Sequence, residues 1–119
     1  VLEDDQNITD TNAEAIAEKI FAPDEKERPK IALQFYIYDR LLQEKGEYAD
    51  KQLFNCVYST SSLFSEAPVV YQKNECFYKA VSQRLEALLN EMYDVNVPFR
   101  RTANMDVCEY CDYKMICGR

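Results

Sequence analysis

The sequence predicts an α+β fold in which helices pack on a small, incomplete sheet and a Cys-rich tail follows. Three stretches carry apolar residues at helical spacing, two short segments between the second and third are rich in β-branched and aromatic residues, and three cysteines lie within ten positions near the C-terminal end. The 119 residues suffice for one domain with one core, which we expect to bury roughly two thirds of its unfolded surface.

The first segment, residues 1–28, mixes Asn, Asp and Thr with one short helical pattern. Apolar residues recur there at helical spacing: Ala13, Ile16, Ala17 and Ile20. A short helix is therefore predicted from Ala13 to Phe21, with Thr11 or Asn12 as its cap. We interpret the whole segment as a surface loop that carries this helix.

A longer helix is predicted between Pro29, which suits a first helical turn, and Gly46, which suits the end of a helix. One stripe runs along it through Ile31, Phe35, Tyr38, Leu42 and Lys45. Further apolar residues lie well away from that stripe: Leu33, Ile37 and Leu41. We therefore expect this helix to be central and to pack on more than one side.

Residues 52–59 have the composition and partial alternation of a strand, and the run from Ser59 to Ser62 is a predicted turn. A second, short strand is predicted from Pro68 to Tyr71, at an edge because of the proline. Asn74 suits the cap of another helix that reaches about Tyr93. Its predicted apolar face consists of Phe77, Val81, Leu85, Leu88 and Met92.

The composition is that of a globular, soluble protein: 47% of the residues are hydrophobic, and the apolar stretches are too short for a membrane span. We expect no membrane contact, no export signal and a cytoplasmic location. The net charge is −7 because residues 1–27 hold nine acids and two bases, whereas residues 28–119 hold twelve of each. The charge thus neither supports nor excludes a DNA partner.

The strongest chemical signal is the spacing Cys-x2-Cys-x5-Cys, formed by Cys108, Cys111 and Cys117. Thiolates two residues apart can bind one metal centre from a tight turn, and the third can return to it. A closed site usually takes four ligands, and the sequence has no histidine. The fourth ligand is Cys56, Cys76, a carboxylate or a residue outside the chain, although Cys56 is more simply a small buried apolar residue and Cys76 a structural one.

The second signal is Gln34 and Tyr38, whose amide and phenol lie one turn apart on one face of the predicted helix. Polar groups in an apolar stripe need partners, and a substrate phosphate or a catalytic lysine can be one. Alone the pattern is weak, because a buried Gln and a core Tyr satisfied by backbone explain it more simply.

Together, in this order, the two signals resemble the end of a RecB/AddB-type nuclease domain of the PD-(D/E)XK superfamily. There, a strand bearing Asp/Glu-x-Lys is followed by a loop, a helix with Gln-x-x-x-Tyr, a strand, a helix and a terminal Cys-x2-Cys-x5-Cys. The resemblance runs from about Arg28 to Arg119 and includes Pro98-Phe99 and the approach from Thr102 to Asp106.

The resemblance implies a fragment of an α/β restriction-endonuclease-like fold. Residues 1–27 would be the acidic loop after a missing catalytic strand, and residues 28–119 the C-terminal part of the nuclease domain, with the Cys-rich tail at 98–119. The parent protein would be a Mg2+-dependent DNA exonuclease of DNA repair and recombination. Gln34 and Tyr38 would be accessory residues that orient the catalytic lysine and the backbone phosphates.

By the same resemblance Cys108, Cys111 and Cys117 would be three of the four ligands of a [4Fe-4S] cluster, with the fourth cysteine upstream of this chain. A strand-borne Asp/Glu-x-Lys is missing from the sequence. Asp24-Glu-Lys26 and Asp112-Tyr-Lys114 have the letters but not a strand pattern, so we treat them as coincidences. We expect the isolated chain to be inactive.

Two alternatives remain. One is a non-catalytic Cys-rich module that binds zinc or an iron–sulfur cluster and contacts protein or nucleic acid. The other is a helical interaction domain without any metal. The nuclease interpretation predicts DNA and a helicase or nuclease subunit as partners of the parent protein, and an exposed sheet edge that favours self-association of the chain.

Overall fold

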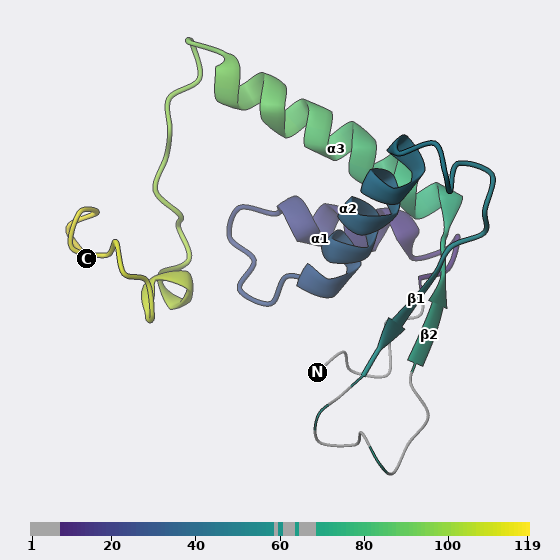
Figure 1. Ribbon diagram of the computed structural model, residues 1–119. Helices are drawn as coiled ribbons and strands as arrows, with labels where there is room; N and C mark the ends of the chain where they lie inside the picture. Colours follow the sequence, from purple (N-terminus) through teal and green to yellow (C-terminus); the bar gives the residue numbers. More distant parts are fainter. Residues whose placement is uncertain (1–7, 59, 61–63, 65–68) are drawn as a thin grey trace.

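The computed structural model describes residues 8–58, 60, 64 and 69–119 (Figure 1). In chain order the elements are α1 (Ala13–Phe21), α2 (Lys30–Glu44), β1 (Phe54–Val57), β2 (Val69–Gln72), α3 (Glu75–Tyr93) and the short 3-10 helix η1 (Met105–Cys108). Within these described ranges, three α-helices accompany a small sheet, and Cys108, Cys111 and Cys117 follow in an irregular tail. This arrangement confirms the predicted α+β fold.

The N-cap residues of the two N-terminal helices, Asn12 and Pro29, make no side-chain cap hydrogen bond, but the ends of both helices follow from local backbone chemistry. Helix α1 ends at Phe21, and the next residue, Ala22, has the extended backbone (ψ 125°) that a following proline favours. Helix α2 starts directly after Pro29, as predicted. It is followed by Gly46 at a φ of +74°, a left-handed conformation that costs glycine little. Both helices confirm their predicted extents.

The strands β1 and β2 form an antiparallel pair within the described ranges. Asn55 lies opposite Tyr71 and Cys56 opposite Val70 in the register. Both predicted strands are confirmed, with β1 shorter than predicted. The predicted turn from Ser59 to Ser62 and the proline that precedes β2 fall largely outside the described residues.

Helix α3 begins at a side-chain cap. The side chain of Asn74 accepts a hydrogen bond from the backbone N–H of Phe77 at 2.8 Å, which satisfies one of the free donors of the first turn. The helix ends at Tyr93, followed by Asp94 in an extended conformation. The predicted cap and both predicted ends are therefore confirmed.

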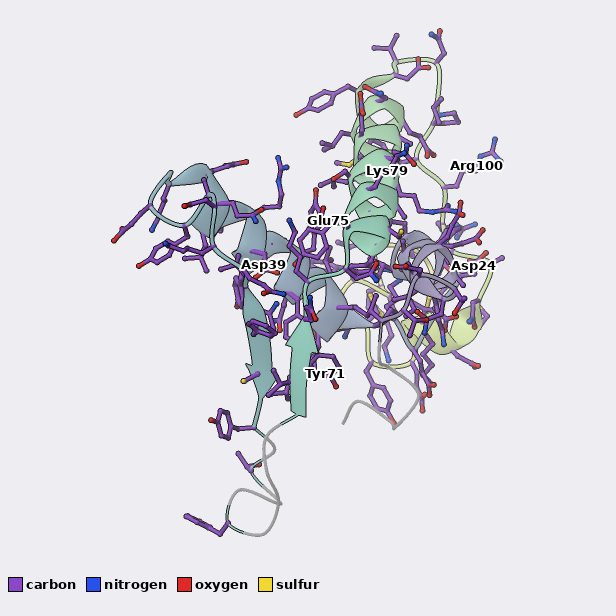
Figure 2. All side chains as sticks on the ribbon, turned by 90° about the vertical axis from the view of Figure 1, so that its right-hand side faces the viewer. Asp24, Asp39, Tyr71, Glu75, Lys79 and Arg100 are labelled. Atoms are coloured by element: carbon purple, nitrogen blue, oxygen red, sulfur yellow. The ribbon has the colours of Figure 1, made fainter. Side chains whose placement is uncertain are left out.

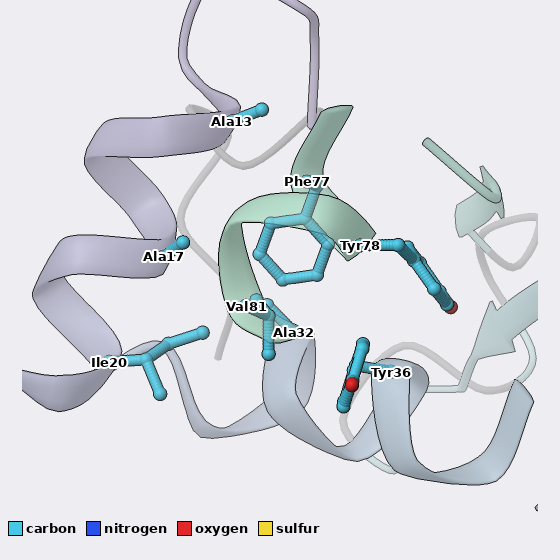
Figure 3. Packing of buried hydrophobic residues seen from close by; sticks show 8 residues of the cluster. All are labelled: Ala13, Ala17, Ile20, Ala32, Tyr36, Phe77, Tyr78 and Val81. Atoms are coloured by element: carbon cyan, nitrogen blue, oxygen red, sulfur yellow. The ribbon is translucent and has the colours of Figure 1, made fainter. Parts of the chain in front are cut away.

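The core lies where the three helices meet, around Phe77 and Val81 of α3, which are both 0% exposed (Figure 3). Helix α1 lines one side with Ala13, Ala17 and Ile20, and α2 closes another with Ala32 and Tyr36. The alanines let the helix backbones approach closely. Burial of a side chain such as Phe77 contributes about 1.5–3 kcal/mol.

This core corrects the interpretation of the first segment as a surface loop. The helix at Ala13–Phe21 was predicted, but its apolar residues form a wall of the main core. The interpretation was wrong because it gave more weight to the nine acidic residues of this segment than to its short apolar pattern. Three buried residues on a nine-residue helix suffice to pack it against α3.

The buried face of α2 also differs from the predicted stripe. It consists of Ala32, Tyr36 and Asp39, whereas Tyr38 and Leu42 of the stripe are exposed. Two residues that flank this face are half-buried: Leu33 packs against the helical core, and Phe35 of the stripe contacts Tyr71 of β2. Because the charged residue Asp39 is part of the buried face, the spacing of apolar residues does not predict this face.

The chain is open for its size. Its accessible surface is 9564 Å², against roughly 6700 Å² for a compact monomer of this mass. Its radius of gyration is 17.1 Å, against roughly 13.5 Å for a compact domain. The expected burial of two thirds of the unfolded surface is therefore wrong, and roughly half is buried. In Figure 1 the far half of α3 extends away from the helical core, and the segment after it runs back toward the α1–α2 connection.

Among the described residues, the helices are all too short or too polar to cross a membrane.

Candidate functional site

A buried carboxylate joins α2 to the sheet and to α3. Asp39 is 2% exposed, and it accepts hydrogen bonds from the phenol of Tyr78 and from Asn55 Nδ2, the latter at 3.0 Å. Figure 2 shows Asp39 near the junction of α2 with the two strands. The rings of Phe35 and Tyr71 meet at the same junction, with centroids 5.2 Å apart. Helix α2 is thus fixed against the sheet by one polar and one aromatic contact.

The phenol of Tyr78 is held in its protonated form. Burial raises the pKa of Tyr78 well above its usual range, and the hydrogen bond and charge of Asp39 raise the pKa further. The same hydroxyl lies 3.2 Å from the Phe35 carbonyl. Lys73 Nζ lies 5.0 Å from the centre of the Tyr78 ring and 2.8 Å from a Glu75 oxygen. Tyr78 therefore acts as a stable donor to Asp39.

The two residues singled out on the central helix lie on an exposed face of α2, whereas Asp39 lies on the buried one. Gln34 and Tyr38 are both exposed, Tyr38 by 55%, and their positions one turn apart place them on one face. Neither side chain has a hydrogen-bond partner in the described part of the chain. The alternative of a buried glutamine beside a core tyrosine is therefore wrong.

Large apolar side chains flank this pair. We name Gln34, Ile37, Tyr38 and Leu41 the outer face of α2; its three large hydrophobic residues are each more than 40% exposed. An amide and a phenol set among exposed apolar side chains are typical of a surface that another molecule or segment covers. The outer face lies on a helix that is fixed to the sheet, which suits a positioned site.

A second polar contact fixes the tail to the segment between α1 and α2. Asp24 Oδ1 accepts hydrogen bonds from the Thr102 hydroxyl at 2.6 Å and from the Ala103 N–H at 2.9 Å. The Asn104 side chain donates to the Asp24 carbonyl at 2.8 Å, and Lys26 pairs with Glu109 at 3.4 Å. Residues 102–109 are thereby docked on residues 24–26.

The hydrogen bonds on Asp24 stabilise its charged form. The Thr102 hydroxyl, followed by the backbone N–H groups of Ala103 and Asn104, lowers the pKa of this carboxyl. Two successive N–H groups that converge on one oxygen form an anion-binding concavity. Here a carboxylate of the same chain fills it.

The three tail cysteines are half-buried and free. Cys108 ends η1, and its carbonyl accepts a hydrogen bond from the Cys111 N–H at 3.2 Å. Three thiols on one short segment have the donor chemistry of a site for a soft metal or an iron–sulfur cluster. Within the described ranges, however, groups of three His, Cys, Asp or Glu side chains that converge on one point are absent. The donors fit such a group by chemistry, and the tail as folded does not gather them.

The other two cysteines lie outside the tail and are exposed. Cys56 is on β1 and Cys76 is in the first turn of α3. A hydrogen bond to Asp10, with the charge of that carboxylate, raises the pKa of the Cys76 thiol. The interpretation of Cys56 as a small buried apolar residue is wrong, because Cys56 is exposed.

The two Asp/Glu-x-Lys matches are off the sheet. Asp24 and Lys26 lie in the α1–α2 connection, and Asp112 and Lys114 lie in turns of the tail. As we expected, neither pair lies on a strand. Asp24 instead docks the tail, a role that its sequence surroundings do not indicate.

A cavity of about 780 Å³ separates the far half of α3 from the returning chain. Leu88 and Met92, the unburied end of the predicted apolar face, line it together with Phe99 and Arg100. Figure 2 shows Arg100 extending from this segment. The apolar face of α3 is therefore covered near Phe77 and left open beyond Leu85.

Sequence reasoning missed the polar contacts of Asp39, Tyr78 and Asp24. For Asp39 the sequence offered one signal: this charged residue follows Tyr36 by three positions and therefore shares its face of an apolar helix. For Asp24 and Thr102, 78 positions apart, the sequence carries no local signal.

A comparison with protein-family models finds the PD-(D/E)XK nuclease superfamily at residues 9–118. The match covers all six elements from α1 to η1. Neither the curated proteins nor the solved structures contain a match to the chain.

Proposed function

The chain belongs to the PD-(D/E)XK nuclease superfamily, and from this membership we propose that it is the C-terminal portion of a Mg2+-dependent DNA exonuclease of the RecB/AddB type. The observation that carries the proposal is the family match over residues 9–118, which contains Gln34 and Tyr38 on one exposed face. The parent protein would act in DNA repair and recombination, alone or with a helicase or nuclease subunit.

The openness of the chain supports a larger nuclease domain. The outer face of α2 exposes three large apolar side chains beside an amide, and the chain exposes far more surface than a compact monomer of its mass. Further strands of the same domain would cover such a face. Without them, the same exposed surface favours self-association of the isolated chain.

The described residues do not by themselves fit Mg2+, because they lack a gathered set of carboxylates and a strand-borne Asp/Glu-x-Lys. Those groups would come from another part of the parent protein. There Mg2+ would stabilise the charge that develops on the scissile phosphate. Gln34 would donate its amide N–H to a phosphate oxygen, and the Tyr38 phenol would orient the catalytic lysine. DNA is accordingly the proposed partner.

For the tail we propose that Cys108, Cys111 and Cys117 supply three ligands of a [4Fe-4S] cluster, with a fourth ligand from elsewhere in the parent. The support is the chemistry of three half-buried thiols within ten positions. The same donors suit Zn2+. A colourless protein with bound zinc and no nuclease activity in the parent would favour the alternative, a non-catalytic Cys-rich interaction module.

The nuclease proposal is tested with the parent protein. Gln34→Ala and Tyr38→Phe should each lower Mg2+-dependent degradation of linear DNA roughly 10- to 100-fold, because they disturb positioning. Gln83→Ala and Tyr93→Phe are matched controls, since both residues are exposed on α3 and away from the outer face of α2. Equal activity of all four variants, or DNA degradation by the isolated chain, would contradict the proposal.

A further inference from the structure

The cavity between the far half of α3 and the returning chain has two chemically different walls. Helix α3 supplies an apolar wall that includes Leu88 and Met92. The returning chain supplies a wall with Phe99, Arg100 and Arg101. The volume of about 780 Å³ is typical of ligand pockets, which measure roughly 300–1,000 Å³. The cavity is thus large enough for a ligand, and its walls offer both apolar surface and positive charge.

Two side chains of the returning chain are left without partners among the described residues. The Phe99 ring is 87% exposed. Arg100 is also exposed, and it makes neither an ion pair nor a hydrogen bond within the described ranges. Figure 2 shows the Arg100 side chain extending away from the ribbon. An aromatic ring beside an unpaired guanidinium is typical of a surface that binds another molecule.

The charge around this ring is positive, although the chain as a whole is acidic. Residues 98–103 contain two bases and no acid, whereas the whole chain has a net charge of −7. Of the two acids that line the cavity, Asp24 is bound to the tail by hydrogen bonds, and Glu91 lies on the α3 wall. The wall that holds Phe99 therefore suits a negatively charged partner.

The chain is fixed directly after Arg100 by two hydrogen bonds. Arg101 Nη1 donates to the Cys117 carbonyl at 2.6 Å, and the Thr102 hydroxyl donates to Asp24 Oδ1 at 2.6 Å. In this contact Arg101 keeps its charge and its other N–H donors. Because consecutive residues are anchored, the ring and the guanidinium project from a backbone that is already in place. Such preorganisation lowers the entropy cost of binding.

We propose that this wall binds single-stranded DNA: a base stacks on the Phe99 ring, and Arg100 contacts a neighbouring phosphate. Proteins that bind single strands combine aromatic rings, on which bases stack, with basic side chains that follow the backbone. A duplex fits less well, because its bases are paired and stacked on one another and offer no free face to a ring. The proposal rests on the proposed function for its choice of DNA, and it adds a contact outside the outer face of α2.

The stacking contact is tested by fluorescence anisotropy of a short labelled oligo-dT with the 119-residue chain, in low salt and without Mg2+. We expect Phe99→Leu to weaken binding about 5- to 100-fold, because leucine is apolar but has no ring for the base, and Phe99→Tyr to retain binding. Tyr93→Leu is the matched control, since Tyr93 is 83% exposed and does not line the cavity. Equal affinities of the Phe99→Leu and Tyr93→Leu proteins would overturn the proposal.

The phosphate contact has a separate signature in the salt dependence of binding. For single strands, each phosphate contact adds about 0.7 to the steepness with which the logarithm of the affinity falls against the logarithm of the salt concentration. Arg100→Gln should therefore reduce this slope by about 0.7, whereas Phe99→Leu should leave it unchanged. Lys79→Gln is the control, because it removes one positive charge from an exposed position outside the cavity. An Arg100→Gln protein with the wild-type slope contradicts the contact.

Two further comparisons separate this proposal from the proposed function. The wild-type chain should bind oligo-dT more tightly than the duplex of oligo-dT with oligo-dA, and equal affinity for both would count against a stacked base. A chain that binds no single strand defeats this proposal alone, because the nuclease activity of the parent protein and of its Gln34 and Tyr38 variants is measured independently. Conversely, binding through Phe99 in a parent protein without nuclease activity supports this proposal and defeats the proposed function.

Discussion

The phenol of Tyr78 on α3 donates a hydrogen bond to the buried carboxylate of Asp39 on α2. The same carboxylate accepts from Asn55 on β1, so one side chain joins three elements. This contact, together with the packing of Tyr36, sets the rotation of α2 about its axis. It thereby leaves Gln34 and Tyr38 on the outward side of the helix.

Removal of the Tyr78 hydroxyl should destabilise the chain. We expect Tyr78→Phe to lower the free energy of unfolding by about 1–3 kcal/mol, because a buried carboxylate loses a donor. Urea unfolding followed by circular dichroism measures the change. Tyr36→Phe is the matched control: its hydroxyl bonds the neutral Ser82 at 2.8 Å, and the cost should be smaller. An equal or larger loss in the control would contradict the role given to Asp39.

Truncation at the centre of the core should have the largest effect on stability. Phe77 is fully buried between α1 and α2, so Phe77→Ala leaves a cavity and should cost about 3–5 kcal/mol. Tyr93→Ala, at a residue that is 83% exposed, should change stability by about 0.5 kcal/mol or less. Thermal unfolding of both variants checks the difference. Similar midpoints would mean that α1 does not pack on α3 as described.

Docking of the tail on Asp24 should depend on pH. The pKa of Asp24 is lowered from 3.8 in the docked state, so the stabilisation is fully present above about pH 4 and is lost as the pH falls through the lower value. Hydrogen exchange of the Ala103 and Asn104 amides measures the docking. Asp24→Ala should remove most of the protection at every pH, whereas Glu27→Gln, on the same connection, should leave it intact. Protection that is independent of both pH and Asp24 would refute the docking.

Loss of the proposed metal should affect the tail and not the helical core. Cys111→Ser, or chelation, should release the metal and increase proteolysis after residue 98, because the core residues lie on α1, α2 and α3. The helical circular dichroism signal should persist. Cys56→Ser is the control, since Cys56 lies on β1 and outside the tail. Collapse of the helical signal on chelation would show that the core depends on the metal.

Several features were predictable because they depend on neighbours in sequence. The Asn74 cap, the start after Pro29 and the stop before Gly46 follow from local backbone chemistry, and each was found where predicted. The Cys-x2-Cys-x5-Cys spacing and the Gln34–Tyr38 pair indicated the nuclease superfamily, which the family match supports over residues 9–118.

By itself the sequence determined the elements, their order and the superfamily, because capping, periodicity and motif spacing act over a few residues. The tertiary structure decided which face of α2 is buried, that α1 belongs to the core, and where the tail docks. These depend on pairs such as Asp39 with Tyr78 and Asp24 with Thr102, which lie 39 and 78 positions apart. Such contacts satisfy the hydrogen bonds of polar side chains that the apolar periodicity of the sequence predicts to be exposed. Only the folded chain therefore reveals them.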